Sequence, residues 1–117
     1  MSSLGELQQR VADFVDKRDW RQFHGDPKNT LLALGGEVGE LMELYRFTTM
    51  QEAQDRSKIR KIDVEDELAD ILYILLMFCE ENDIDLEQAF IQKEKKREVK
   101  YPVEKFKGIN AKYTEME

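Results

Sequence analysis

The chain has 117 residues, of which 41% are hydrophobic and 37% are charged, and its formal net charge is −7. The length is typical of one domain, and the composition is too apolar for a disordered chain and too charged for a membrane protein. A lone cysteine, Cys79, excludes a disulfide scaffold. The first residues lack the pattern of a secretory signal, and the longest apolar stretch, residues 68–79, is too short to cross a bilayer. We therefore expect a cytoplasmic protein without a membrane partner.

Charge is distributed unevenly along the chain. Residues 1–90 carry a net charge of −10, whereas residues 91–117 carry +3. A short basic segment on an acidic protein does not suit a nucleic-acid polymer, but it could attract the phosphates of one small ligand. The alternative interpretation is a solvated helix face followed by a mobile tail. We expect residues 1–117 to form a single domain with a basic C-terminal tail from about residue 101.

A capping signal marks the first helix. Ser3 and Glu6 form a capping box, and apolar residues follow at spacings of three and four, so we predict a helix from Leu4 to about Lys17. Residues 18–28 should form a loop.

A second helix should begin near Pro27, because Asp26 can cap it and proline fits the first helical turn. We expect this helix to carry residues 31–47. Glycine in a helix interior costs about 1 kcal/mol relative to alanine, and this helix contains three glycines, Gly35, Gly36 and Gly39. Close approach of a neighbouring helix or of a ligand is the expected reason.

Further helical signals complete the chain. Thr49 starts another capping box and should begin a short helical turn, and residues 57–82 form the longest periodic segment. Because residues 68–79 are apolar around the whole helix, we expect a second chain to cover one side. A fourth helix should begin after Asp85 and end before Pro102. The sequence thus predicts an all-α bundle of four main helices.

Two acidic pairs lie on two of these helices. Glu37 and Glu40 are three residues apart on the second helix, and Glu67 and Asp70 repeat the spacing on the longest one. Residues three apart share a face, so the two carboxylates of each pair repel each other. Burying the Asp70 carboxylate among apolar neighbours would also cost free energy. A cation would resolve both problems, and an all-oxygen site suits Mg²⁺ or Mn²⁺ better than zinc.

A metal site is one of two interpretations of these acids. The same spacing is common on solvated helix faces, so the pairs could be surface charge. Glu43 and Asp63 lie on neighbouring turns and could be outer ligands or surface charge.

The order of the motifs resembles that of the dCTP pyrophosphatases, which belong to the MazG-like superfamily of all-α nucleoside triphosphate pyrophosphatases. The similar stretches are RDWRQFH at 18–24, LLAL at 31–34 running into EVGEL at 37–41, and ELADIL at 67–72. Shorter matches follow at Lys93, at KYP (100–102) and at KYTE (112–115). The resemblance covers about residue 11 to the end and implies a MazG-like bundle assembled as a dimer or tetramer.

The resemblance also implies an activity, which is hydrolysis of a nucleoside triphosphate between its α and β phosphates to the monophosphate and pyrophosphate. The carboxylates of Glu37, Glu40, Glu67 and Asp70 would hold Mg²⁺, which neutralises phosphate charge and orients a water. We assign the proton-accepting role to Glu40, with Glu37 beside it, although the spacing alone leaves all four carboxylates open.

Basic residues near the C-terminus match the family's phosphate contacts. Lys93 occupies the family's lysine position, Lys100 replaces an arginine, and Tyr101 matches the tyrosine before proline. Arg97 stands in place of an asparagine near the sugar or phosphates. The alternative is a basic helix end stabilised by the helix dipole, with Tyr101 serving in packing.

Aromatic residues should hold the base by stacking. Trp20 is the best candidate, although it could equally anchor the core, and Phe47 stands where the dCTP enzymes have a second tryptophan. His24 is more typical of a cap or packing residue than of a catalytic one.

The base pocket departs from the family pattern. Val11 replaces a base-contacting histidine, and Ile74 replaces a tyrosine, while the adjacent Tyr73 is rotated some 100° around the helix. We therefore predict a pyrophosphatase with dCTP-like substrates first and wider tolerance. The alternatives are hydrolysis of another nucleotide-like metabolite, such as phosphoribosyl-ATP, and a non-catalytic helical dimer that binds a nucleotide or a protein.

Overall fold

The structure, a computed structural model, describes residues 1–116, and its contacts divide the chain into two units, Met1–Ile84 and Asp85–Glu117. Each unit is described by itself. Every regular element among residues 1–116 is helical, which confirms the predicted all-α class. None of these helices combines the length and apolar character needed to cross a bilayer.

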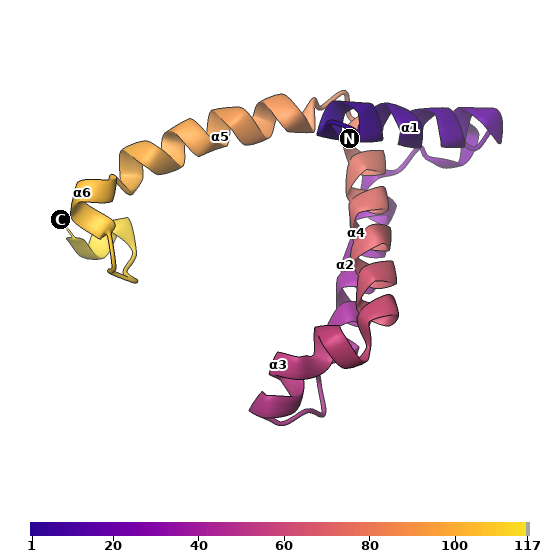
Figure 1. Ribbon diagram of the computed structural model, residues 1–117. Coiled ribbons are helices and arrows are strands. Elements are labelled where there is room, and N and C mark those ends of the chain that lie inside the picture. Colours follow the sequence, from indigo (N-terminus) through magenta and orange to yellow (C-terminus); the bar gives the residue numbers. More distant parts are fainter. Residues whose placement is uncertain (117) are drawn as a thin grey trace. The chain divides into compact units, whose positions relative to one another are not determined.

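The first unit consists of α1 (Leu4–Lys17), the 3₁₀ turn η1 (Arg21–Phe23), α2 (Pro27–Glu43), α3 (Met50–Ile59) and α4 (Lys61–Glu81). Figure 1 shows α2 lying alongside α4, with α1 against one end of this pair and α3 at the other end. The side-by-side packing of α2 and α4 is what positions the candidate site.

The core of the first unit is small. Its buried apolar side chains come from α1 and α4, and they are Val11, Ala12, Val15, Val64, Leu76 and Cys79. Many large apolar side chains of α2 and α4 stay exposed, including Leu32 and Leu68. A Cβ placed on Gly35, Gly36 or Gly39 would meet no atom within 4 Å. The expected close approach of a neighbouring helix or of a ligand at these glycines is therefore not supplied by residues 1–116 of one chain, and a ligand or a helix of a second copy stays a prediction.

Helix starts follow the predicted caps. Ser3 Oγ accepts a hydrogen bond from the Glu6 N–H (3.1 Å), and Asp26 Oδ1 accepts one from the Lys28 N–H (3.0 Å). Thr49 forms a complete capping box, so the short turn expected there is in fact the ten-residue helix α3. A capping residue satisfies backbone donors that a helix start leaves free.

Two helix boundaries were predicted wrongly. α2 ends at Glu43 rather than at residue 47, because the chain must become extended at Thr49 (φ −73°, ψ 168°) to cap α3. The long segment begins at Lys61 rather than at residue 57, because Arg60 leaves the helical region (φ −113°, ψ 41°) between α3 and α4. Hydrophobic periodicity runs through this break, which is why the sequence did not reveal it.

The second unit contains α5 (Leu86–Lys100), the short α6 (Val103–Phe106) and the 3₁₀ turn η2 (Tyr113–Met116). Asp85 caps α5 as predicted, accepting a hydrogen bond from the Gln88 N–H (3.1 Å). After α5, the Tyr101 ring packs edge-on against Phe106 and Tyr113. These contacts organise residues 101–113 around an aromatic cluster.

Candidate functional site

Three carboxylates meet where α2 lies alongside α4. Glu37 of α2 and Glu67 and Asp70 of α4 each offer an oxygen, and these oxygens lie within 4.8 Å of one another. We call these three residues the carboxylate triad. One oxygen of Glu37 and one of Glu67 are buried without a hydrogen-bond partner in residues 1–116. Buried polar atoms are nearly always partnered, so these two oxygens indicate a missing ligand.

Burial and mutual repulsion raise pKa values in this cluster. Burial is the largest of the causes that raise the pKa of Glu67 to about 7, and the neighbouring carboxylates of Glu40 and Glu37 contribute the rest. Burial likewise raises the pKa of Glu37, and contact with Glu40 adds to the effect. A divalent cation would relieve the repulsion and satisfy the free oxygens, and hard ions prefer all-oxygen donor sets. The triad therefore fits a divalent metal.

The other predicted acids differ from the triad. Glu40 is exposed and lies outside it, although its carboxylate is near enough to raise the pKa of Glu37 and Glu67. Glu43 pairs with Arg46 (3.6 Å), and Asp63 pairs with Arg60 (2.6 Å). These pairs favour the surface-charge interpretation for Glu43 and Asp63 over outer metal ligands.

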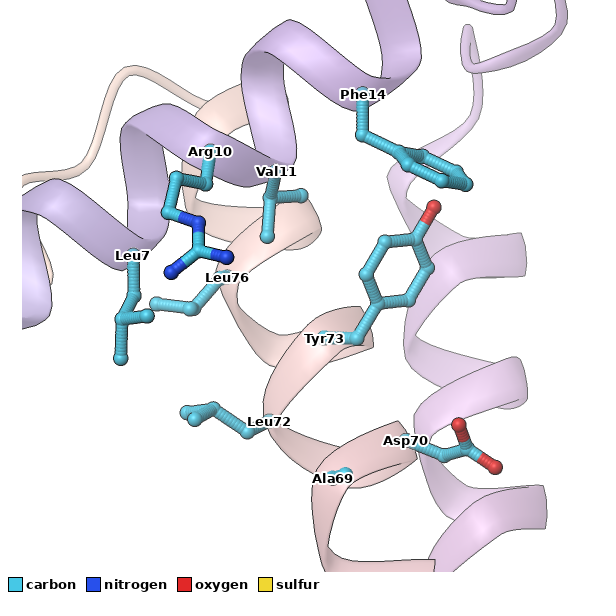
Figure 2. A pocket seen from close by; sticks show the side chains of 9 residues that line it. All are labelled: Leu7, Arg10, Val11, Phe14, Ala69, Asp70, Leu72, Tyr73 and Leu76. Carbon is cyan, nitrogen blue, oxygen red and sulfur yellow. The ribbon is translucent and has the colours of Figure 1, made fainter. Parts of the chain in front are cut away.

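A pocket of about 600 Å³ adjoins the triad between α1 and α4. Its lining is mostly apolar, with two aromatic rings and two charged groups (Figure 2), and consists of Leu7, Arg10, Val11, Phe14, Ala69, Asp70, Leu72, Tyr73 and Leu76. Asp70 belongs both to the triad and to the pocket. A ligand held at the triad would thus find an apolar cavity beside it.

The sequence predicts only part of the lining of this pocket. Val11 does line it, but Ile74 does not, and Tyr73 takes a place on the wall with its ring edge-on to Phe14 (5.8 Å). The apolar spacing of α1 predicts the helix but not which of its apolar side chains line a pocket. The signal that could have revealed a pocket is Arg10, a charged residue within that apolar stripe.

The two aromatic candidates for base stacking have different surroundings. The Trp20 side chain is 41% exposed and packs edge-on against Phe14, with ring centroids 5.7 Å apart. Phe47 is 81% exposed, and the Arg46 guanidinium lies 4.7 Å from its ring centroid. Trp20 is therefore partly anchored and partly open, whereas Phe47 is almost free to contact a ligand.

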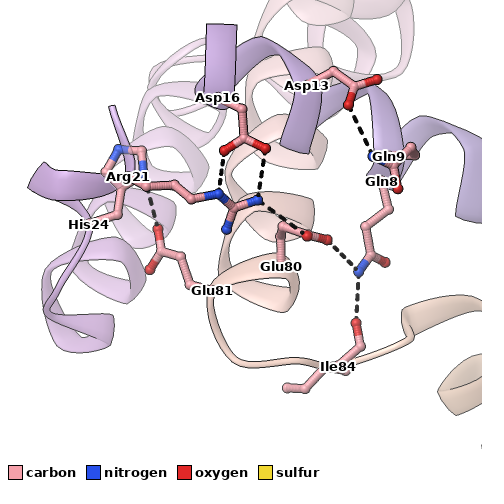
Figure 3. A network of polar contacts seen from close by, with 9 residues as sticks. All are labelled: Gln8, Gln9, Asp13, Asp16, Arg21, His24, Glu80, Glu81 and Ile84. Carbon is pink, nitrogen blue, oxygen red and sulfur yellow. Dashed lines mark hydrogen bonds and ion pairs between the residues drawn. The ribbon is translucent and has the colours of Figure 1, made fainter. Parts of the chain in front are cut away.

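A polar network that the sequence did not reveal fixes the loop between α1 and α2 (Figure 3). Arg21 pairs with Asp16 and with Glu80, and His24 Nδ1 lies 3.7 Å from Glu81 Oε1. The Thr30 hydroxyl, which is buried, also donates to Glu81. His24 therefore contacts Glu81 within this network, and its assignment as a cap or packing residue stays a prediction.

The basic candidates lie in the second unit. Lys93 is exposed, Arg97 lies over the Phe90 ring (5.7 Å), and Lys100 Nζ lies 4.9 Å from the Tyr113 ring centroid. The Tyr101 hydroxyl accepts a hydrogen bond from the Tyr113 N–H (3.3 Å). These contacts give Tyr101 a packing role and leave the Lys93 charge open to solvent.

Comparisons with known proteins agree with this geometry. The model of the MazG-like family matches residues 36–116. The chain is 38% identical to dCTP pyrophosphatase 1 of Bos taurus and 36% identical to that of Homo sapiens, each over 97% of this chain and 68% of the relative. A crystal structure of a pyrophosphatase from Archaeoglobus fulgidus superposes with a TM-score of 0.76 at 35% identity, covering 87% of this chain and 94% of that one.

Proposed function

The chain belongs to the MazG-like family and is a nucleoside triphosphate pyrophosphatase, and from this membership we propose that it is Mg²⁺-dependent and acts first on dCTP-like nucleotides. The observation that carries the proposal is the carboxylate triad, with its two buried, unpartnered oxygens. We further propose that the enzyme acts in the cytoplasm, where its lone thiol, the buried Cys79, stays reduced.

In the proposed mechanism, Glu37, Glu67 and Asp70 would hold the metal. Mg²⁺, or Mn²⁺ in its place, would supply charge neutralisation at the phosphate oxygens. Glu40 stands beside the triad without belonging to it, so its carboxylate is the one free to accept the proton of the attacking water. Water then adds its oxygen at the phosphoryl group, the bond between the α and β phosphates breaks, and the monophosphate and pyrophosphate leave.

The substrate's remaining parts would meet residues outside the triad. We propose that the base enters the pocket of Figure 2 and that Trp20 and Phe47 supply aromatic surface near it. The pocket supports this proposal because it shares Asp70 with the triad. From the family resemblance alone, we also propose Lys93, Arg97, Lys100 and Tyr101 as contacts of the phosphates.

Release of pyrophosphate from a panel of nucleotides, with and without a chelator, tests the function. We expect Mg²⁺-dependent turnover that is fastest with dCTP-like substrates, and Glu67→Gln should lower kcat on the order of 10²- to 10³-fold. Glu65→Gln is the matched control, because Glu65 is exposed on the same helix and pairs only with Lys61 (4.0 Å). Turnover of no triphosphate would contradict the proposal, and activity confined to phosphoribosyl-ATP would favour the alternative substrate class.

We also propose that the enzyme is a homodimer or homotetramer. Exposed apolar side chains on α2 and α4, such as Leu32 (68% exposed) and Leu68 (51%), support this, because a monomer would leave them in water. Sedimentation at micromolar concentration should give a mass above that of one chain, and a stable monomer would contradict the assembly.

A further inference from the structure

We propose that Arg10 selects the nucleobase, favouring bases that carry a ring carbonyl over adenine, which has none. This inference rests on the proposed function for the position of the nucleotide. It goes beyond that function by assigning base discrimination to one residue.

Arg10 is the cationic member of a mostly apolar pocket. Its side chain extends from α1 into the view of Figure 2 beside Leu7 and Val11, and Asp70 lies on the other side of the pocket. No ion pair joins Arg10 to Asp70. The guanidinium therefore has room to meet a ligand.

The acidic neighbours of Arg10 on α1 are engaged elsewhere. Glu6, four residues before it, accepts a hydrogen bond from the Ser3 hydroxyl (3.3 Å). Asp13, three residues after it, accepts one from the Gln9 side-chain amide (3.0 Å). Residues at these spacings are the natural helical partners of an arginine. Within residues 1–116 the Arg10 side chain thus forms no ion pair and no hydrogen bond.

The hydrogen-bonding chemistry of the pocket is dominated by donors. A guanidinium carries five N–H donors and no acceptor. The opposing polar groups are the Tyr73 hydroxyl, which can donate or accept, and Asp70, which belongs to the triad. Cytosine, thymine and guanine present carbonyl oxygens that accept from a guanidinium. Adenine has acceptors only at its ring nitrogens, and its N1 and N7 each stand beside the amino group. One donor of the Arg10 fork would therefore face that amino group unpaired.

The experiment compares base preference in the wild type and in Arg10→Met, which keeps an unbranched apolar stem and removes the guanidinium. We expect kcat/KM for dCTP relative to dATP to fall roughly 10-fold or more in Arg10→Met, since a good arginine–base contact discriminates by about that factor. Arg10→Lys should give an intermediate ratio, because lysine keeps the charge but loses the planar fork. Lys17→Met is the matched control, because it removes a positive charge from the same helix outside the pocket and should leave the ratio unchanged.

Calorimetric binding of dCMP, dTMP, dGMP and dAMP separates this inference from the proposed activity. The wild type should bind dAMP most weakly, and Arg10→Met should bind the four alike. If the wild type hydrolyses no triphosphate but shows this binding preference, the proposed activity fails and the role of Arg10 stands. Unchanged base ratios in Arg10→Met, in turnover and in binding, would overturn the role of Arg10 and leave the activity intact.

Discussion

The middle and the C-terminal end of α4 each present acidic side chains to the rest of the first unit, and their surroundings are opposite. At the C-terminal end, Glu80 accepts hydrogen bonds from Arg21 and from the Gln8 amide (Figure 3). The neighbouring Glu81 accepts one from the Thr30 hydroxyl. In the middle of the helix, Glu67 and Asp70 lie beside other carboxylates, and no basic side chain in residues 1–116 pairs with them.

The difference separates structural acids from functional ones. A carboxylate that is fully partnered by the chain contributes to stability, because its charge is compensated in the fold. A half-buried carboxylate that is left beside other carboxylates costs stability, and such a cost persists where a site needs it. The paired end of α4 thus fixes the loop that carries Trp20, whereas the unpaired acids in its middle suit a cation.

The largest effect should come from the unpaired acids in the middle of α4. Glu67→Gln removes a proposed metal ligand, and we expect kcat to fall on the order of 10²- to 10³-fold, as when an electrostatic stabiliser of a transition state is lost. Circular dichroism should show an intact helical fold. Retained full activity would reduce the triad to a charged surface.

The paired end should respond in stability instead. Thr30→Val removes the hydroxyl that donates to Glu81 Oε2 (3.0 Å), and we expect a loss of about 1.5–3 kcal/mol in the free energy of unfolding, which is typical of hydrogen bonds to charged groups. Turnover should change little. Urea denaturation measures the loss, and Thr114→Val, at an exposed threonine, is the control. Equal stability in both variants would show that Glu81 does not need this partner.

The sequence could predict the acidic pair in the middle of α4 but not the contacts at its C-terminal end, and the reason is physical. The local spacing of Glu67 and Asp70 is enough to predict that they lie together, because residues three apart on a helix share a face whatever the tertiary structure. The partners of Glu80 and Glu81 lie 51 to 72 residues away in sequence, and no local pattern marks them. Arg10 was missed for a related reason, because an apolar stripe alone does not tell a filled core from an open pocket.

The pH dependence of stability sharpens the comparison without substrate. The pKa of Glu67 is raised from 4.5 to about 7, so between these values the folded protein holds a proton that the unfolded chain releases. The contribution of protonated Glu67 to the free energy of unfolding is therefore fully present below pH 4.5 and is lost as the pH rises through about 7. In chelator, the Tm should therefore fall between pH 5 and pH 8. Added Mg²⁺ should restore it at pH 8.

Two variants test whether Glu67 causes this fall in Tm with pH. Glu67→Gln should flatten the fall in Tm, whereas Glu65→Gln on the same helix should leave it unchanged. A slope that survives in Glu67→Gln would place the titrating group outside the triad.

The smallest effect concerns the open face of α2, which neither end of α4 covers. In one chain alone, Gly36→Ala adds a Cβ that meets no atom within 4 Å, so the helix should gain about 1 kcal/mol. In the proposed assembly a second copy packs against that face, where Leu32 stands one turn earlier and is 68% exposed. The added Cβ should then lower the Tm at high protein concentration and shift sedimentation toward the monomer. A gain in stability at every concentration would mean that this face of α2 is open to water in solution, and the cost of its glycines would need another cause.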